Sequence, residues 1–375
     1  MQVKTLTKAP LRSALGEAVF CLAGIPFAST TMHSTVAKVI DAGCERRRYL
    51  FATPNINFVA NAMRDRAFAG AITRCDAALI DGAPLVVAAR LLGIRHAERV
   101  AGSDLFEEID QTLRQRNEKL TVFFFGGRTG ASEAAHRRFE NRTAGFVSVG
   151  FSNPGFGDVA DMVGGETLNE INELSPSFLV VALGAVKGHA WIERVRGALS
   201  VPVISHLGAV VDFAAGGISR APVWMRRSGL EWLWRIKEEP ALWRRYAGDM
   251  TALLTLFFLQ VLPLALWRAT AGRSKEPPSV DVNLTSNATI LKLTGAFQNH
   301  EVSLLSDPIC RAVEAGKPVE LDFGELKFID LFPQGKLLIM KRYLLEQGIP
   351  VSIGAAPKSL ERALKASGFA RAVAL

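Results

Sequence analysis

TPNINFVANAMRDRAFAGAITRCDAALIDGAPLVVAARLLGIRHAERVAGSDLF, residues 53–106, is the stretch of sequence that decides the fold. Two apolar runs typical of β-strands, YLFAT (49–53) and CDAALI (75–80), end abruptly in polar residues, and a helix-like stretch follows each of them. In an open α/β sheet, ligands bind in the crevice outside the carboxyl ends of the strands. The polar residues at these two strand ends therefore predict a binding site at one edge of a sheet.

The alternation of strand-like and helix-like stretches continues to about residue 206, beginning with FCLAGI (20–25), which we expect to form one strand. Near-continuous apolar runs such as TVFFFGG (121–127) are typical of parallel strands covered by helices on both faces. The pattern predicts an α/β fold with a Rossmann-like, mostly parallel sheet, followed by a smaller α/β unit. The expected domains are an α/β domain at 1–219, an Arg/Trp-rich helical appendage at 220–269, a linker at 270–280 and a small α/β domain at 281–375.

Composition narrows the classes of partner. The 375 residues carry a formal net charge of +8, which favours a polyanionic partner such as nucleic acid, a phosphorylated substrate or an anionic membrane face. A mean hydropathy of +0.18 indicates that one segment meets lipid or a large interface. The four cysteines and six histidines show no metal-ligand spacing, so we expect reduced thiols and neither a metal nor another cofactor. No signal peptide is expected, because the first residues lack a long apolar core.

Asp81, Thr53 and Asn55 are the candidate catalytic residues at the two strand ends. A carboxylate such as Asp81 can accept a proton from a sugar hydroxyl and make it nucleophilic. The alternative is that Asp81 only caps the helix that begins near Pro84. Thr53 and Asn55 are of the kind that orients a ligand, but taken alone they are better explained by helix capping and Asx-turn chemistry. The residue pattern alone leaves these alternatives open.

Two glycine-containing turns are candidate phosphate sites. Gly126 and Gly127 open the turn GGRTG, which matches neither a dinucleotide fingerprint nor a P-loop. Its amides and the following helix could hold a diphosphate, or the glycines could simply make a tight turn. Gly184 and Lys187 form a second turn of this kind. His189, which follows it, is expected on the surface of a helix, with a role in the site as the alternative.

Tryptophans and arginines interleave between residues 220 and 245. Arginine binds phosphate bidentately and tryptophan favours the water–lipid interface, so this segment predicts a membrane-surface element that also meets a lipid diphosphate. A solvated helix face is the alternative. No nucleic-acid partner is expected, because no recognised nucleic-acid module accompanies the basic patch.

The apolar segment 249–267 is about long enough to cross a bilayer, but Gln260 and Pro263 interrupt it and basic residues flank both ends. We expect a helix lying in the membrane plane or shallowly inserted, with a true span as the alternative.

Five blocks in a fixed order carry a family resemblance: TPNINFVANAMRD, DGAPLVVAARLLG with ERVAGSDLF, FFFGGRTG, VALGAVKGHAWI, and the segment 207–246. Residues from about 20 to 246 resemble the WecG/TagA/CpsF glycosyltransferases. The resemblance implies an inverting enzyme, without a required metal, that moves a hexose-type sugar from a UDP-sugar to a polyprenyl-diphosphate-linked acceptor. It further implies a role in surface or exopolysaccharide synthesis and a cytoplasmic location, peripheral to the inner face of the cell membrane.

The resemblance makes Asp81 the general base and Thr53 and Asn55 active-site residues. One departure stands out: where the family commonly has Pro-Lys-Gln-Glu, this chain has Val186-Lys187-Gly188-His189, so either the donor sugar differs or activity is lost. The positions expected to bind substrate are Gly82, Arg99, Gly102, Asp104, Gly126, Gly127, Gly184, Lys187, Asp212, Arg220, Arg227, Arg235 and Arg245.

The stretch VELDFGELKFIDLFPQGKLLIMKRYLLEQGIPVSIGAAP (319–357) resembles a STAS domain. In phosphorylatable members a Ser or Thr follows the Asp of the Ile-Asp turn, whereas Asp330 here precedes Leu331, so we expect no phosphoswitch. A docking role toward a protein partner remains. The alternative function is therefore a catalytically inactive member that acts as a STAS-mediated scaffold or regulator at the membrane.

Overall fold

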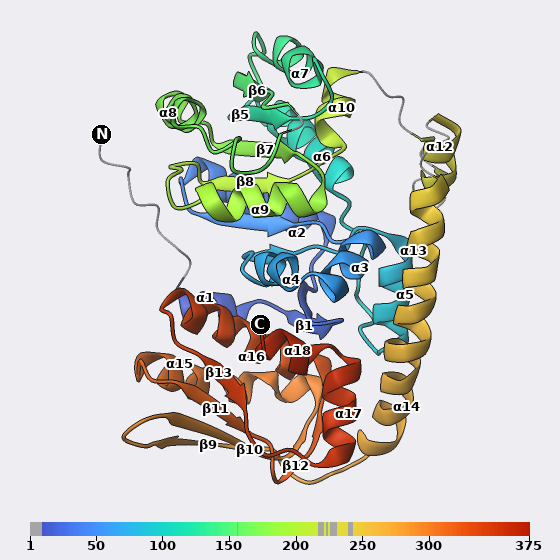
Figure 1. Cartoon of the computed structure of the whole chain (residues 1–375), viewed down its shortest axis with the longest axis vertical. Coiled ribbons are helices and arrows are strands. Elements are labelled where there is room, and N and C mark those ends of the chain that lie inside the picture. Colours follow the sequence, from blue (N-terminus) through green and yellow to red (C-terminus); the bar gives the residue numbers. More distant parts are fainter. Residues whose placement is uncertain (1–9, 156, 217–220, 223, 226–230, 239–242) are drawn as a thin grey trace.

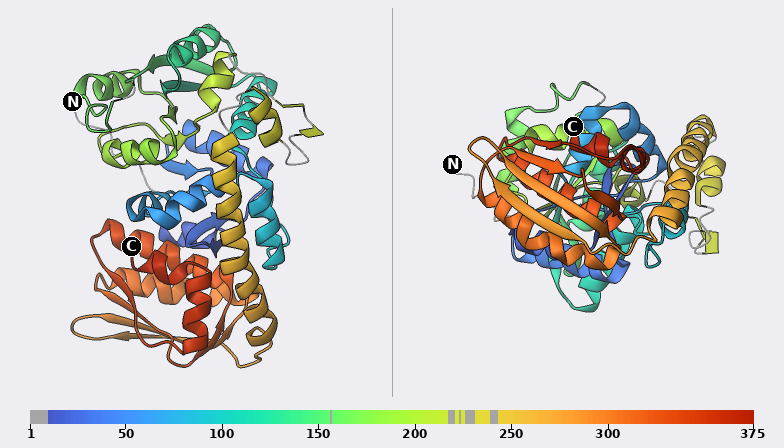
Figure 2. Two further views of the ribbon diagram at one scale, coloured as in Figure 1. Left: turned by 45° about the vertical axis from the view of Figure 1, so that its right-hand side comes forward. Right: turned by 90° about the horizontal axis from the view of Figure 1, so that it is seen from below.

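The computed structural model describes residues 10–155, 157–216, 221–222, 224–225, 231–238 and 243–375. Two α/β bodies lie one above the other along the long axis, and a long helix runs beside both of them (Figure 1, Figure 2).

The upper body contains an eight-stranded sheet in the order β1-β2-β4-β3-β8-β7-β5-β6. β1 and β2 are antiparallel and the other neighbours are parallel, which confirms the predicted mostly parallel sheet. The strands are β1 (Val19–Leu22), β2 (Ile25–Ala28), β3 (Tyr49–Ala52), β4 (Ala77–Ala78), β5 (Lys119–Gly126), β6 (Gly145–Ser152), β7 (Phe178–Ala182) and β8 (Val203–His206).

Helices cover both faces of this sheet, and the three phenylalanines of β5 show why. Phe123 and Phe125 enter one apolar cluster, while Phe124 between them enters the cluster on the opposite face. Successive side chains of a strand point to opposite faces, so a continuous apolar run requires cover on both sides. The described helices of this body are α2 (Met32–Cys44), α3 (Ile56–Arg64), α4 (Arg66–Thr73), α5 (Ala83–Leu91), α6 (Gly102–Gln115), α7 (Ala131–Phe139), α8 (Gly165–Leu174), α9 (Ala185–Val195) and α10 (Val210–Ala215). Helix α1 (Leu11–Gly16) instead places Ala14 and Leu15 in the core of the lower body.

The segment FCLAGI does not form one strand, as the sequence predicted: its first three residues belong to β1, Ala23 and Gly24 form the hairpin turn, and Ile25 begins β2. Ala23 and Gly24 have φ of 53° and 78°, the left-handed pair that a two-residue hairpin turn requires. Within β1, Phe20 and Leu22 enter the core of the upper body, whereas Val19 and Cys21 enter the core of the lower one. The hairpin is therefore shared by both bodies.

The long helix is continuous from residue 243 to 271. A π-helical segment ends two residues before Pro263, whose backbone nitrogen carries no hydrogen and cannot donate the usual i to i−4 hydrogen bond. The helical elements of the appendage are α12 (Glu231–Glu238), α13 (Trp243–Leu256), the π-helical segment η2 (Phe257–Val261) and α14 (Leu262–Ala271).

The lower body has a five-stranded sheet in the order β12-β10-β11-β13, with β9 antiparallel to β10. This mixed sheet with its helices confirms the predicted second α/β unit. Its elements are β9 (Ser279–Leu284), β10 (Thr289–Phe297), the 3₁₀-helix η3 (Asn299–Leu305), α15 (Ser306–Glu314), β11 (Val319–Asp322), β12 (Leu326–Ile329), α16 (Leu331–Glu346), β13 (Val351–Ile353), α17 (Lys358–Ala366) and α18 (Phe369–Val373).

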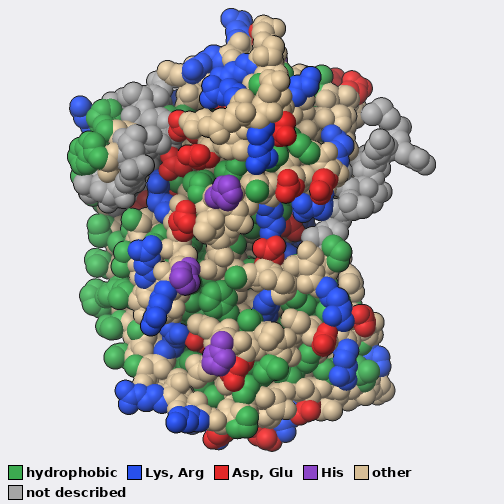
Figure 3. Space-filling view, turned by 180° about the vertical axis from the view of Figure 1, so that it is seen from behind, with side chains coloured by type: hydrophobic (Ala, Val, Ile, Leu, Met, Phe, Trp, Pro, Cys, Tyr) green, Lys and Arg blue, Asp and Glu red, His purple; other side chains and the backbone are tan. Residues whose placement is uncertain are grey.

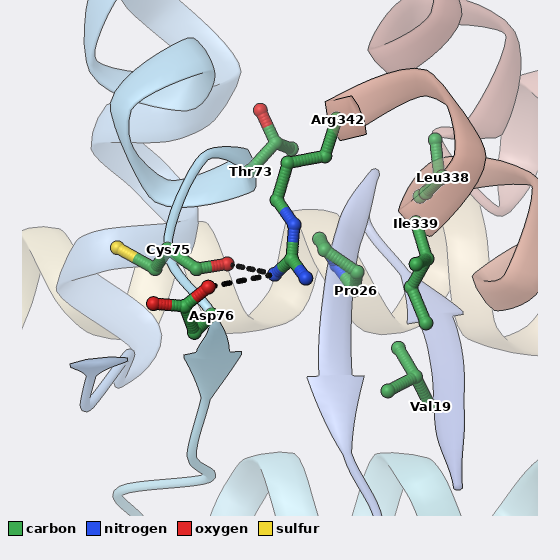
Figure 4. Close-up of a pocket in the computed structure, with 8 residues that line it drawn as sticks. All are labelled: Val19, Pro26, Thr73, Cys75, Asp76, Leu338, Ile339 and Arg342. Atoms are coloured by element: carbon green, nitrogen blue, oxygen red, sulfur yellow. Dashed lines mark hydrogen bonds and ion pairs between the residues drawn. The ribbon is translucent and has the colours of Figure 1, made fainter. Parts of the chain in front are cut away.

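Helix α16 packs directly on β1, so the two bodies form one packed unit. A Cβ atom on Gly335 would overlap the carbonyl oxygen of Val19, which means that the helix and strand backbones touch. Arg342 of α16 points into the junction, where its Nη1 donates to the Cys75 carbonyl oxygen at 2.5 Å and lies 3.9 Å from Asp76 Oδ1 (Figure 4). The interface thus combines close apolar packing with a buried cation.

Candidate active site

The carboxyl ends of β3 and β4 lie side by side, with Ala52 paired to Ala78. Thr53 follows β3 directly and is 6% exposed. A Cβ atom on Gly102 would lie 3.2 Å from Thr53 Oγ1, so the first residue of α6 closes against the threonine. Only a glycine at this point lets the backbone approach so closely.

Asn55 is the N-cap of α3. Its side-chain oxygen accepts a hydrogen bond from the Phe58 backbone nitrogen at 3.1 Å. The capping interaction that the sequence left open is therefore present, and it fixes the orientation of the Asn55 amide at the mouth of the crevice. A Cβ atom on Gly82 would lie 4.0 Å from Asn55 Cβ, which places the two strand ends in contact.

Asp81 joins the second strand end to the first, because its backbone nitrogen donates to the Pro54 carbonyl oxygen at 3.0 Å. The N-cap of α5 is Gly82 rather than Asp81. Gly82 has φ of +137°, a conformation open essentially to glycine alone. The chain therefore turns sharply just after Asp81, which is half-buried beside Thr53 and Asn55.

Arg99 and Asp104 form an ion pair at the same edge of the sheet. Arg99 Nη1 lies 2.9 Å from Asp104 Oδ2, and the side chains are 22% and 17% exposed. The Val100 backbone nitrogen donates to the Ile80 carbonyl oxygen at 2.8 Å, which brings this segment next to Asp81. The pair supplies a cation and an anion at the border of the crevice.

The backbone of the GGRTG turn is already partly used in hydrogen bonds of the protein itself. Gly126 and Gly127 have φ of +85° and +93°, and the Gly127 nitrogen already donates to the Ala182 carbonyl oxygen at 2.7 Å. That amide extends the sheet and is not available for a diphosphate. Arg128 of the turn lies 3.8 Å from Asp212 of α10, so the turn and α10 meet across the sheet edge.

Gly184 is the N-cap of α9, with φ of +80° and open space where a Cβ atom would lie. Lys187 Nζ donates to the Gly157 carbonyl oxygen at 2.7 Å. The prediction that His189 lies on the surface is wrong: its side chain is 1% exposed, because this face of α9 packs against α4.

The described positions therefore gather where the predicted crevice should be, at the carboxyl edge of the parallel strands. The sequence missed His206, the last residue of β8 at this same edge, whose side chain is buried. Within the described ranges, no three His, Cys, Asp or Glu side chains gather as a metal-binding group. Arg220 and Arg227 lie outside the described residues, and the side chains of Arg235 in α12 and Arg245 in α13 lie outside them as well.

Comparison with known families identifies the class of protein. Residues 20–266 match the model described as "Glycosyl transferase WecG/TagA/CpsF family", and residues 280–375 match the model described as "Mlab, STAS domain". The first match covers well over half of the chain. The chain belongs to the WecG/TagA/CpsF glycosyltransferase family and carries a C-terminal STAS domain.

Three similar curated proteins all have the name N-acetylglucosaminyldiphosphoundecaprenol N-acetyl-beta-D-mannosaminyltransferase. The protein from Bacillus spizizenii is 30% identical over 194 residues, covering 52% of this chain and 72% of its own length. The Bacillus subtilis protein is 26% identical over 196 residues, covering 52% and 74%. A Staphylococcus aureus protein is 25% identical over 215 residues, covering 56% and 82%. These relationships are distant.

Proposed function

We propose that the chain is an inverting glycosyltransferase that moves a hexose-type sugar from a UDP-sugar to a polyprenyl-diphosphate-linked acceptor in surface or exopolysaccharide synthesis. The family match and the names of the relatives support this class of donor and acceptor. The observation that carries the proposal is the meeting of Thr53, Asn55 and Asp81 at two adjoining strand ends, closed by Gly82 and Gly102.

The proposed reaction needs one base. Asp81 takes the proton of the acceptor hydroxyl while the hydroxyl oxygen forms a bond to the anomeric carbon. The bond from that carbon to the UDP oxygen breaks on the opposite face, so the configuration inverts and UDP leaves with the electron pair. Helix N-termini at the sheet edge, such as that of α9 after Gly184, and nearby arginines would stabilise the diphosphate charge.

The long helix supports a location at the inner face of the cell membrane. Among the described residues, Ala247–Ala271 is the one helix long and apolar enough to cross a membrane by length and composition, and 17% of its most apolar window is buried. Its exposed apolar side chains, together with two from the adjoining α5, project from one border of the molecule in Figure 3. We call these residues the apolar stripe: Val87, Leu91, Met250, Leu254, Phe258, Leu259, Leu262 and Leu266.

The packing of the helix favours an in-plane position over a span. Its first part packs on α3 of the transferase domain, and its last part packs on α17 of the STAS domain. Leu256, Val261 and Leu264 face inward and are 1% exposed each. A spanning helix would have to leave these contacts. We therefore propose that the apolar stripe enters one leaflet while both domains stay on the cytoplasmic side.

The test is transfer from a panel of UDP-sugars to a short polyprenyl-diphosphate-linked sugar, with the wild-type chain and Asp81→Asn. Removing the base should lower kcat about 10²–10⁴-fold without changing the unfolding curve. Asp307→Asn, the same change at a side chain 76% exposed on the STAS domain, is the matched control and should keep full activity. A fully active Asp81→Asn enzyme would remove Asp81 as the base. A folded wild-type chain that transfers no sugar from any donor would instead favour the scaffold function.

A further inference from the structure

Two buried histidines lie against each other behind the crevice. His189 of α9 and His206 of β8 are 1% and 5% exposed, and their ring centroids are 5.5 Å apart. Phe58 packs on both rings, at 5.6 and 6.0 Å, and Phe68 packs on His189 at 5.7 Å. We call His189 and His206 the histidine pair.

The surroundings of the pair suit neutral imidazoles. Nε2 of His189 and both ring nitrogens of His206 are buried and have no hydrogen-bond partner among the described residues. A Cβ atom on Gly188 would overlap the His206 ring, so this glycine provides the space that the ring occupies. The departure from the family pattern at Gly188 and His189 thus coincides with the construction of the pair.

No carboxylate in the described structure stands ready to balance a charge on the pair. Burial depresses the pKa of His206 to about 4, and burial together with neighbouring His206 holds the pKa of His189 well below its usual range. The charged groups on the surrounding elements are exposed or bound to other residues. Glu193, for example, forms an ion pair with Arg74, with 2.5 Å between Glu193 Oε2 and Arg74 Nε. These groups are Arg64 on α3, Arg66 on α4, and Lys187, Glu193 and Arg194 on α9.

The pair connects directly to the crevice through Phe58. This residue stands in the first turn of α3, and its backbone nitrogen donates to the capping oxygen of Asn55. His206 ends β8, which pairs with β3, and β3 leads into Thr53. The rings therefore support the helix turn that orients Asn55.

We propose that the histidine pair is a proton-sensitive positioning element: the neutral rings hold Phe58 and the first turn of α3, and protonation of either ring releases that turn and with it Asn55. The link to catalysis rests on the proposed role of Asn55 in sugar transfer.

The direction of the pH effect follows from the two states. We call the state in which Phe58 and the first turn of α3 are held the closed state, and the state in which that turn is released the open state. Below about pH 6.5 the open or unfolded chain takes up protons at these histidines. The closed chain does not take up a proton at His206 until about pH 4. The closed state is therefore favoured fully above pH 6.5 and loses its advantage as the pH falls. Each histidine can raise the opening constant up to about tenfold per pH unit in this window.

The test is hydrogen exchange of peptides covering residues 56–64 in the full chain between pH 7.5 and 5, corrected for the intrinsic exchange rate. Protection in the wild type should fall below pH 6.5, and His189→Leu or His206→Leu should each flatten that fall by up to about tenfold per pH unit. His33→Gln, at an exposed histidine, is the matched control and should keep the wild-type slope. Equal slopes in wild type and both Leu variants would overturn the proposal.

If the Leu variants fail to fold, exchange at the imidazole C2 position in the wild-type chain gives the pKa of each histidine. Values below about 6 for both histidines support the proposal, and a value of 6 or more for either histidine overturns it. Neither measurement uses a substrate, so an absence of sugar transfer would refute the proposed function without touching this result. Conversely, a transferase whose residues 56–64 exchange independently of pH would refute the proton-sensitive support alone.

Discussion

One aspartate precedes strand β4 and another follows it, and the surroundings of these two aspartates differ. At the amino end, Asp76 Oδ2 accepts from the Leu50 backbone nitrogen at 2.8 Å, and Arg342 of the STAS domain reaches the same carboxylate. Beyond the carboxyl end, Asp81 is followed by Gly82 with φ of +137°, and its backbone nitrogen donates to the Pro54 carbonyl oxygen. The first aspartate is held by β3 and α16, whereas the second lies where the chain turns sharply into a helix.

This difference shows what the STAS domain contributes to the transferase domain. Its helix α16 reaches the amino end of β4 through Arg342, and through Gly335 it packs on Val19 of the edge strand β1. These contacts tie β1 and the amino end of β4 to the STAS domain. The STAS domain is therefore a structural support for the transferase domain.

The largest expected effect comes from separating α16 from β1. Gly335→Val places a branched side chain against the Val19 carbonyl oxygen, with backbone on both sides, and should lower the free energy of unfolding by about 3 kcal/mol or more. Urea unfolding measures this. Gly248→Val, at a helical glycine with open space around it, is the control and should change stability by about 1 kcal/mol or less. Equal effects would mean that α16 and β1 do not depend on close contact.

Removing the cation at the amino end of β4 should have a somewhat smaller effect. Arg342→Met keeps much of the apolar stem but leaves the Cys75 carbonyl oxygen and Asp76 without their cation, which should cost about 2–3 kcal/mol. Arg12→Met removes an ion pair to Asp307 that is exposed on both sides, and its unfolding midpoint should not move. If the unfolding midpoint of Arg342→Met were as high as that of Arg12→Met, the junction between the domains would not depend on the positive charge of Arg342.

At the carboxyl end, Gly82→Ala tests backbone strain alone, because a Cβ atom there has room. The positive φ should cost about 1–3 kcal/mol, and the shifted turn should lower sugar transfer. Gly16→Ala, at a glycine without positive φ and with open space, should be neutral or slightly stabilising. If both variants unfold alike, the turn after Asp81 is not a strained feature.

The apolar stripe should give the smallest change in stability. Leu259→Ser together with Leu266→Ser alters side chains that are 68% and 61% exposed, so the unfolding free energy should move by no more than about 0.5 kcal/mol. Sedimentation with anionic vesicles should nevertheless fall clearly. Leu284→Ser, 60% exposed on β9 of the STAS domain, should leave vesicle binding unchanged. Undiminished binding by the double variant would exclude the apolar stripe as the membrane contact.

Much of this arrangement could be predicted from the sequence because it depends on local patterns. The apolar run from Phe123 to Phe125 predicts a sheet that is covered on both faces, as the structure has it. The polar residues after the strands predict the position of a binding site at the sheet edge. Burial of His189 could not be predicted, since it depends on the space over Gly188 and on Phe68 from another helix. The contact of Gly335 with Val19 joins residues more than three hundred positions apart and leaves no local pattern.

Strand β1 gives alternate side chains to two hydrophobic cores, Phe20 and Leu22 to one and Val19 and Cys21 to the other. Neither core can melt while the other keeps this strand in place, so heating should produce a single cooperative transition instead of two. A protease nick in residues 272–278 would cut the chain without freeing either half, because the hairpin would still hold them together. In evolutionary terms, a strand embedded in both cores makes the fusion difficult to reverse.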